Sequence, residues 1–257
     1  MIKGGSFIMG DGSDDDNPKH NVTLTDFYIC KYETTNAEFL NIYGFDRIKN
    51  GEYKDEFIFD SEEFGIQKDG KIWKPASSQY ANHPVVRVSW FGANEFCKFW
   101  DIQLPTEAQW EFSARSCGKN YKYSWGNDEP RGKNTKKFGN MADLTLHKKQ
   151  PHLTVYEKKY EDGYDITSPV GSFDPNELGL FDMSGNVFEW CEDWYDSNFY
   201  KNPEGEINPA NLKTKTSRVL RSGSWYRTAW HCRMACRSNV APGGRFNDIG
   251  FRPCFVE

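Results

Sequence analysis

The stretch Gly179-Leu-Phe-Asp-Met-Ser-Gly-Asn-Val-Phe-Glu-Trp190 combines apolar residues with a tight turn in the C-terminal half of the chain. Its two carboxylates, Asp182 and Glu189, are separated by backbone carbonyls on that turn. Hard oxygen ligands of this kind suit Ca²⁺. A second interpretation stays open, in which both carboxylates cap the turn by accepting hydrogen bonds from backbone amides.

The segment that follows, residues 221–252, alternates between two kinds of residue. Small residues and arginines fit a scaffold, because small residues allow tight turns and a guanidinium bonds several groups at once. These scaffold residues are Gly223, Ser224, Trp225, Ala229, Cys232, Arg233, Ala235, Arg237, Pro242, Arg245, Ile249, Gly250, Phe251 and Arg252. Residues of mixed aromatic, polar and small type lie between them, as on recognition surfaces.

Upstream, several short elements are predicted. Residues 6–9 and 22–29 alternate apolar and polar side chains, and residues 57–59 and 85–88 are candidate short strands. Asp69-Gly70 predicts a hairpin turn. The capping boxes Thr35-Asn-Ala-Glu38 and Thr106-Glu-Ala-Gln109 predict helix starts, and a further helix begins near Phe91 with Ala93, Phe96, Cys97 and Trp100 on its apolar face. Residues 118–175 show almost no periodicity, so we expect long loops and an α+β fold.

Composition limits the class of protein. The chain has 257 residues, 16% of them aromatic, including nine Trp, so aromatic packing can hold a loop-rich core. A net charge of −5 without a basic stretch argues against nucleic acid as a partner. The apolar runs are too short for a transmembrane segment. Seven cysteines without a CxxC pair give little support to a zinc site or a disulfide framework.

Seven sequence blocks occur in one order along nearly the whole chain. They are Gly4-Gly-Ser-Phe-Ile-Met-Gly10, Glu33-Thr-Thr-Asn36, Pro84-Val-Val-Arg-Val-Ser-Trp90, Leu104-Pro-Thr-Glu-Ala-Gln-Trp-Glu-Phe112, Gly179 to Trp190, Arg218-Val-Leu-Arg-Ser-Gly-Ser-Trp225 and Ile249-Gly-Phe-Arg252. The chain resembles the formylglycine-generating-enzyme, or sulfatase-modifying-factor, family. This resemblance implies one C-type-lectin-like domain over residues 1–257, but not an activity, because the fold hosts several functions.

The resemblance also implies two structural calcium sites. The first would use the side chains of Asp182 and Glu189 with the carbonyls of Gly185 and Val187. The second would use Asn140, the Met141 carbonyl, Asp162 and the Tyr164 carbonyl, and would hold both ends of the long loop.

Enzymes of this family oxidise a substrate cysteine with copper bound by two thiolates, which are soft ligands for a soft ion. The first family position corresponds to Arg227 and the second to Cys232. We therefore expect no copper, and Cys232 fits a buried core thiol. A copper-dependent formylglycine-generating oxidase is the alternative function, in which Cys236 would lend the second sulfur. An iron-dependent branch needs a His-x-x-x-His-x-Glu spacing, which none of the five histidines provides.

The C-terminal pattern resembles the variable region of proteins that retroelements diversify, as in a Treponema variable protein. This resemblance implies a bacterial, exported or cell-surface binding protein that is monomeric and not an enzyme, although no signal peptide is visible. The ligand would be a protein or another surface ligand. Its predicted contacts are Tyr226, Arg227, Thr228, Trp230, His231, Cys236, Ser238, Val240, Ala241, Gly243, Phe246, Asn247 and Asp248. Simple packing of these loops is the other interpretation.

Overall fold

The structure is a computed structural model that describes residues 1–43, 65–69, 72–201 and 207–256. Its strands are β1 (Gly5–Met9), β2 (His20–Leu24), β3 (Tyr28–Ile29), β4 (Ile66–Asp69), β5 (Ile72–Pro75), β6 (Gly132–Lys133), β7 (Tyr160–Glu161), β8 (Phe188–Trp194), β9 (Arg218–Arg221), β10 (Ser238–Val240), β11 (Ile249–Gly250) and β12 (Cys254–Phe255). Its helices are α1 (Asn36–Tyr43), α2 (Trp90–Phe99), α3 (Glu107–Ala114), α4 (Leu144–Lys149) and the 3-10 turns η1 (Ser78–Tyr80) and η2 (Phe199–Lys201).

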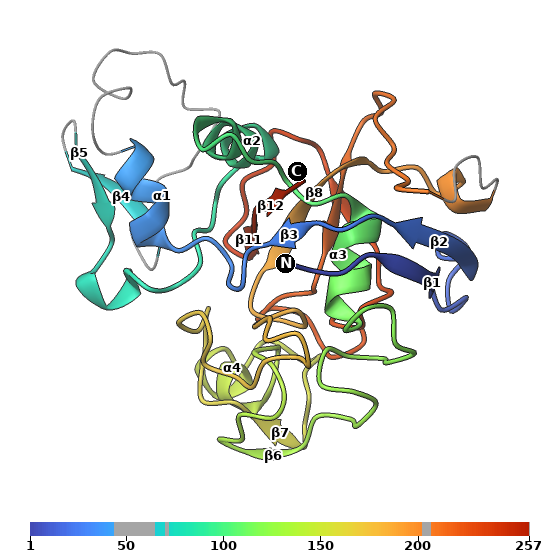
Figure 1. The fold of residues 1–257 in the computed structure, drawn as a ribbon. Helices are drawn as coiled ribbons and strands as arrows, with labels where there is room; N and C mark the ends of the chain where they lie inside the picture. The colour runs from blue at the N-terminus through green and yellow to red at the C-terminus, as the bar shows by residue number, and fades with distance from the viewer. Residues whose placement is uncertain (44–64, 70–71, 202–206, 257) are drawn as a thin grey trace.

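The central sheet has the strand order β10-β9-β8-β11. Strand β8 pairs antiparallel with β9, which places Glu189 opposite Arg221, and it pairs in parallel with β11. Helix α3 packs against β1, β8 and β9 at the centre of the molecule (Figure 1). The sheet and α3 therefore bring the Gly179-to-Trp190 stretch together with both ends of residues 221–252.

Both predicted capping boxes are present. The Glu38 carboxylate accepts hydrogen bonds from the Thr35 amide, and the Thr35 hydroxyl accepts one from the Glu38 amide, so α1 begins where expected. Thr106 and Gln109 make the same reciprocal pair at α3. The interpretation of Trp100 as an apolar-face residue is wrong, because α2 ends at Phe99 and the Trp100 side chain is 56% exposed.

Other short elements depart from the sequence pattern. Residues 85–88 form no strand, since Arg87 adopts a left-handed φ of 58° that interrupts extended backbone, although the valines are buried. The predicted hairpin strands exist as β4 and β5, whereas residues 57–59 lie outside the described ranges. The aperiodic middle contains α4, which begins after Asp143, whose carboxylate caps the amides of Thr145 and Leu146.

Aromatic side chains fill the core, as their abundance indicates. Trp110 and Trp190 are fully buried, and each indole N–H is bonded. The two chain ends meet near the centre, because β12 pairs with β3 and Ile2 bridges to Phe27 (Figure 1). No helix in the described ranges is long and apolar enough to cross a membrane.

Candidate ligand-binding surface and metal sites

Buried ion pairs hold the C-terminal framework to α3. The Arg221 guanidinium lies 2.8 Å from a Glu107 carboxylate oxygen and 2.6 Å from one of Glu111. Arg237 binds both oxygens of Glu107, at 2.7 and 2.9 Å. These groups are almost fully buried, so each charge depends on its partner for stabilisation. Arg221 at the start of the segment and the predicted scaffold residue Arg237 within it therefore anchor the segment to α3.

The residues between the scaffold positions mostly face solvent. Tyr226, Trp230 and Phe246 are 38%, 53% and 51% exposed, which is high for large aromatic side chains. The other exposed predicted contacts are Arg227, His231, Ala241 and Gly243. Thr228, Cys236, Ser238, Val240 and Asn247 are half-buried. Sequence alternation in this segment thus corresponds to alternation between inward and outward side chains.

Two contacts join the start of the exposed segment to its end. Tyr226 packs edge-on against Trp225, whose indole N–H donates to the Asn247 carbonyl next to Phe246. Partial burial, and then the charges of Arg227 and Arg233, lower the pKa of His231.

Trp230 has a rigid support that the sequence pattern did not reveal. Its ring lies over the Arg233 guanidinium, with 3.8 Å between the ring centroid and Cζ. Arg233 in turn donates to the carboxylates of Asp11 and Asp14, at 2.6 and 3.3 Å. The N-terminal acidic loop therefore fixes the position of an exposed aromatic residue more than 200 positions away, and only tertiary structure could show this pairing.

Asp248 corrects the predicted contact set. Its side chain is only 8% exposed, and its carboxylate accepts a 2.9 Å hydrogen bond from the Ser224 hydroxyl. Burial raises the pKa of this carboxyl group. Asp248 therefore lies behind the exposed surface and orients the loop instead of facing a ligand.

The first predicted calcium set does not fit a cation. Both oxygens of Glu189 accept from Arg252 at 2.7 Å, and one also accepts from the Trp110 indole. Gly185 offers its carbonyl to the Ser222 hydroxyl, and Asp182 accepts from the Gly171 amide. Carboxylates already paired in this way are poor Ca²⁺ ligands. Asp182 accepts from a backbone amide, as the turn-capping interpretation expects, whereas Glu189 pairs with side chains and does not cap the turn. Val187, the remaining residue of this set, is buried immediately before β8.

The second predicted set fits a cation better. The Asn140 side-chain oxygen is buried without a hydrogen-bond partner, although its amide donates to Ile166. Asp162 is buried and accepts from the amides of Met141 and Tyr164, at 3.1 and 2.7 Å. Burial and the nearby Asp143 raise the pKa of Asp162 to about 8. A cation here would give the Asn140 oxygen a partner, and it would reduce the repulsion between the carboxylates of Asp162 and Asp143.

Asp143 is a residue that sequence reasoning missed at this second set. Its position before the short apolar pattern of α4 is an N-cap signal that could have identified it. Among the described residues, no three His, Cys, Asp or Glu side chains form a metal-binding cluster by themselves. The second set would therefore depend on its amide and carbonyl oxygens.

The matching family model describes a sulfatase-modifying factor enzyme 1-like domain and spans residues 1–255. The chain belongs to this family. A formylglycine-generating enzyme of Thermomonospora curvata is 32% identical over 98% of this chain and 91% of its own. This finding contradicts the prediction that the chain is not an enzyme, because a relative similar over nearly its full length is named for a catalytic activity.

Solved structures confirm the predicted fold class. PvdO from Pseudomonas aeruginosa matches with a TM-score of 0.75 and 26% identity, covering 100% of this chain and 93% of that one. Treponema denticola variable protein 1 matches with a TM-score of 0.69 and 22% identity, covering 100% and 94%. The second likeness shows a shared fold.

The family's two thiolate positions do not fit a copper site in this chain. Arg227 is exposed and cationic, whereas Cys232 is fully buried, and burial raises the pKa of its thiol. An added Cβ at Gly223 would lie 2.7 Å from the Cys232 sulfur, so the thiol fills a tight space beside the backbone. These contacts agree with a core packing role for Cys232.

Proposed function

We propose that residues 226–248 form a ligand-binding surface whose side chains can be varied on the family scaffold. The supporting observation is the division of this segment by burial. Trp225, Ala229 and Cys232 are 3%, 2% and 0% exposed, whereas the interleaved Tyr226 and Trp230 are 38% and 53% exposed. Exposed aromatic residues beside an arginine are typical of binding hot spots.

The scaffold supports such variation because the buried ion pairs of three of its arginines do not involve the exposed residues. Arg221, Arg237 and Arg252 make their ion pairs with α3 and β8, beneath the surface. Surface substitutions away from such buried features usually change stability by about 0.5 kcal/mol or less. Many side-chain combinations would therefore leave the fold intact.

Sequencing this gene from many isolates of its species tests the proposal. We expect substitutions to concentrate at the exposed positions of residues 226–247 and to spare the buried framework. Uniform variation along the chain, or an invariant segment, would contradict a diversified surface.

A display experiment tests the surface directly. One library would randomise Tyr226, Arg227, Trp230, His231 and Phe246, and a matched library would randomise the buried Ala229, Cys232, Ala235, Ile249 and Phe251. We expect selection against lysozyme as a probe to yield folded binders from the first library alone. Equal recovery from both, or no binders from the first, would reject the proposal.

We also propose that the second oxygen set holds a structural Ca²⁺ ion. The supporting observation is the buried Asn140 oxygen without a partner, beside the buried carboxylate of Asp162. The protein's residues would supply the Asn140 and Asp162 side chains with the carbonyls of Met141 and Tyr164. An ion at this position would link residues from two parts of the long loop, and it would act on stability.

Thermal melts with Ca²⁺ and with a chelator test this proposal. At a Ca²⁺ concentration 100 times the Kd, we expect about 2.7 kcal/mol of stabilisation, which the chelator removes. Asp162→Asn should abolish the response, whereas Asp165→Asn, at a half-buried position outside the set, should preserve it. Identical melts of the wild-type protein under both conditions would rule out a stabilising ion.

A further inference from the structure

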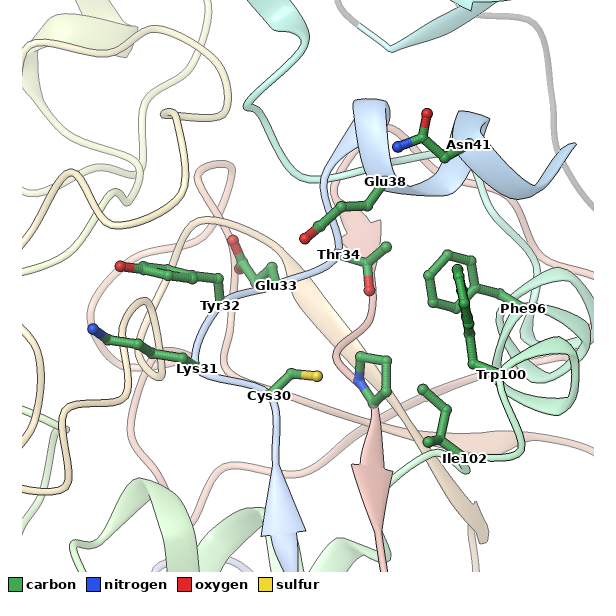
Figure 2. Close-up of a pocket in the computed structure, with 11 residues that line it drawn as sticks. Cys30, Lys31, Tyr32, Glu33, Thr34, Glu38, Asn41, Phe96, Trp100 and Ile102 are labelled. Atoms are coloured by element: carbon green, nitrogen blue, oxygen red, sulfur yellow. The ribbon is translucent and has the colours of Figure 1, made fainter. Parts of the chain in front are cut away.

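Two cavities of the molecule differ in the chemistry of their walls. One, of about 340 Å³, lies beside α1 and the end of α2. Figure 2 shows its apolar wall of Phe96, Trp100 and Ile102. The charged ends of Lys31 and Glu33 point away from that wall in the same view. Apolar contact is non-directional, so this wall selects a ligand by size and not by chemical class.

The other cavity, of about 470 Å³, is part of the C-terminal surface. Its lining comes from two segments, the loop before α2 with Arg87 and the loop before β11 with Gly243, Arg245, Phe246 and Asn247. Both arginines are half-buried, and the Phe246 ring is 51% exposed. A cavity of this size suits a small molecule, and here polar groups can fix its orientation.

Main-chain contacts hold the two lining segments together. The Arg87 amide donates to the Phe246 carbonyl at 2.9 Å, and the Trp90 amide donates to the Pro242 carbonyl at the same distance. Arg87 has a φ of 58°, a conformation that is uncommon for a residue with a side chain and that persists only where the surrounding structure holds it. The placement of Arg87 beside the 243–247 loop therefore does not depend on the exposed side chains of the surface.

Positive charge predominates in the sequence around this cavity. Residues 226–247 contain four arginines and no aspartate, glutamate or lysine. Two of these arginines, Arg233 and Arg237, pair with carboxylates of the N-terminal acidic loop and of α3. The Arg227 side chain is exposed and makes no hydrogen bond or ion pair with any residue that the structure describes. The carboxylate of Asp248 is buried behind the surface, where it accepts from Ser224.

The arginines that line the cavity can bind an anion while they also contact the protein. A guanidinium carries several N–H donors in a planar fork. Arg221 shows this capacity in the same chain, because its guanidinium binds Glu107, Glu111 and the Met234 carbonyl at once. A phosphate group brings more negative charge and more acceptor oxygens to two such forks than a carboxylate does.

We propose that this cavity binds a small aromatic phosphate. The phosphate oxygens accept from Arg87 and Arg245, and the aromatic ring packs against Phe246. Arg87 lies outside residues 226–248, and Arg245 is one of the scaffold residues, so the anion site stays constant while the neighbouring side chains vary. This inference rests on the function proposed above, since it assigns a ligand class to the same surface.

Isothermal titration of the whole chain with phenyl phosphate tests the inference. We expect this probe to bind. Benzyl alcohol, which lacks the charge, and methyl phosphate, which lacks the ring, should bind at least about tenfold more weakly. Added salt should weaken the binding of phenyl phosphate, because an exposed charge pair is screened. No binding of phenyl phosphate, or equal binding of the neutral alcohol, overturns the proposal.

Matched arginine variants locate the phosphate. Arg87→Gln and Arg245→Gln should each weaken binding about tenfold, whereas Arg131→Gln, at an exposed position outside the cavity, should leave it unchanged. Arg245→Lys keeps the charge without the planar fork, so we expect a smaller loss. Circular dichroism confirms that each variant is folded. Equal binding by the cavity variants and by Arg131→Gln would reject this site.

A second pair of variants locates the ring. Phe246→Ala should weaken the binding of phenyl phosphate but not that of methyl phosphate, because only the first probe has a ring to pack. Phe255→Ala removes a 40% exposed ring outside the cavity and should change neither. Equal losses for the two variants would place the aromatic group elsewhere and reject the proposed orientation.

The anion site and the diversified surface can fail separately. Variation among isolates at the exposed positions, together with no binding of phenyl phosphate, would reject the anion site alone. Binding of phenyl phosphate that depends on Arg87 and Arg245, together with an invariant segment among isolates, would support the anion site and reject diversification.

Discussion

Arg221 and Arg227 are six positions apart, yet they have opposite environments. Arg221 is fully buried between Glu107 and Glu111, whereas Arg227 is exposed beside Tyr226. Trp225 and Trp230 differ in the same way, at 3% and 53% exposure. Residue type alone therefore does not separate framework from surface. The partner of each side chain decides whether it is buried, because a guanidinium can lie in the core when it pairs with the carboxylates of α3.

Removing one buried charge should have the largest effect. Arg221→Leu leaves Glu107 and Glu111 with one partner fewer inside the core, and we expect a loss of about 3–5 kcal/mol in the free energy of unfolding. Arg227→Leu should change it by about 0.5 kcal/mol or less. Urea denaturation measures both. Similar losses for the two variants would remove the distinction between framework and surface.

The two tryptophans give the next largest contrast. Trp225→Ala should cost about 3–5 kcal/mol, since it opens a cavity and removes the hydrogen bond to Asn247. Trp230→Ala should cost about 1 kcal/mol or less, because it removes only an exposed stacking contact with Arg233. Thermal melts of both variants measure the two losses of stability. A larger loss for Trp230→Ala than for Trp225→Ala would show that the Trp230 ring belongs to the core.

The acidic loop should have a smaller effect on stability. Asp11→Asn combined with Asp14→Asn weakens the support of Arg233 beneath Trp230, and we expect a loss of about 1 kcal/mol. The exposed Asp15→Asn is the matched control and should be neutral. Increased mobility of the Trp230 indole in NMR relaxation should accompany the double change. An unchanged indole signal would mean that Arg233 does not depend on this loop.

The smallest expected effect is a pKa change within the surface. Partial burial and then the charge of Arg227 lower the pKa of His231, so Arg227→Ala should raise that pKa toward the ordinary value of 6.5. Because the folded-state pKa is depressed, the unfolded state binds the proton first as pH falls below 6.5, and His231 then reduces stability. NMR titration of the imidazole measures the shift. No change, or an equal change in Arg131→Ala, would show that Arg227 and His231 do not adjoin.

Prediction from the sequence succeeded where local chemistry decides structure. The capping boxes at Thr35 and Thr106 fixed two helix starts, because each box satisfies backbone donors within four residues. It failed at residues 85–88, where the positive φ of Arg87 breaks an apolar stretch that otherwise favours a strand. The short α4 was missed because its six residues carry too little periodicity against a polar loop.

The amino-acid sequence by itself determined the family, the fold class and the alternation of small or basic residues with aromatic and polar ones in residues 221–252. Seven blocks in the family's order along nearly the whole chain are sufficient for the family and the fold class. Only the tertiary structure decided which charges are buried. Glu189 could bind calcium or Arg252, and Asp248 could face a ligand or Ser224. Such choices depend on groups distant in the sequence. A charge loses its hydration when it is buried, and only the partners that the fold brings to it can compensate this loss.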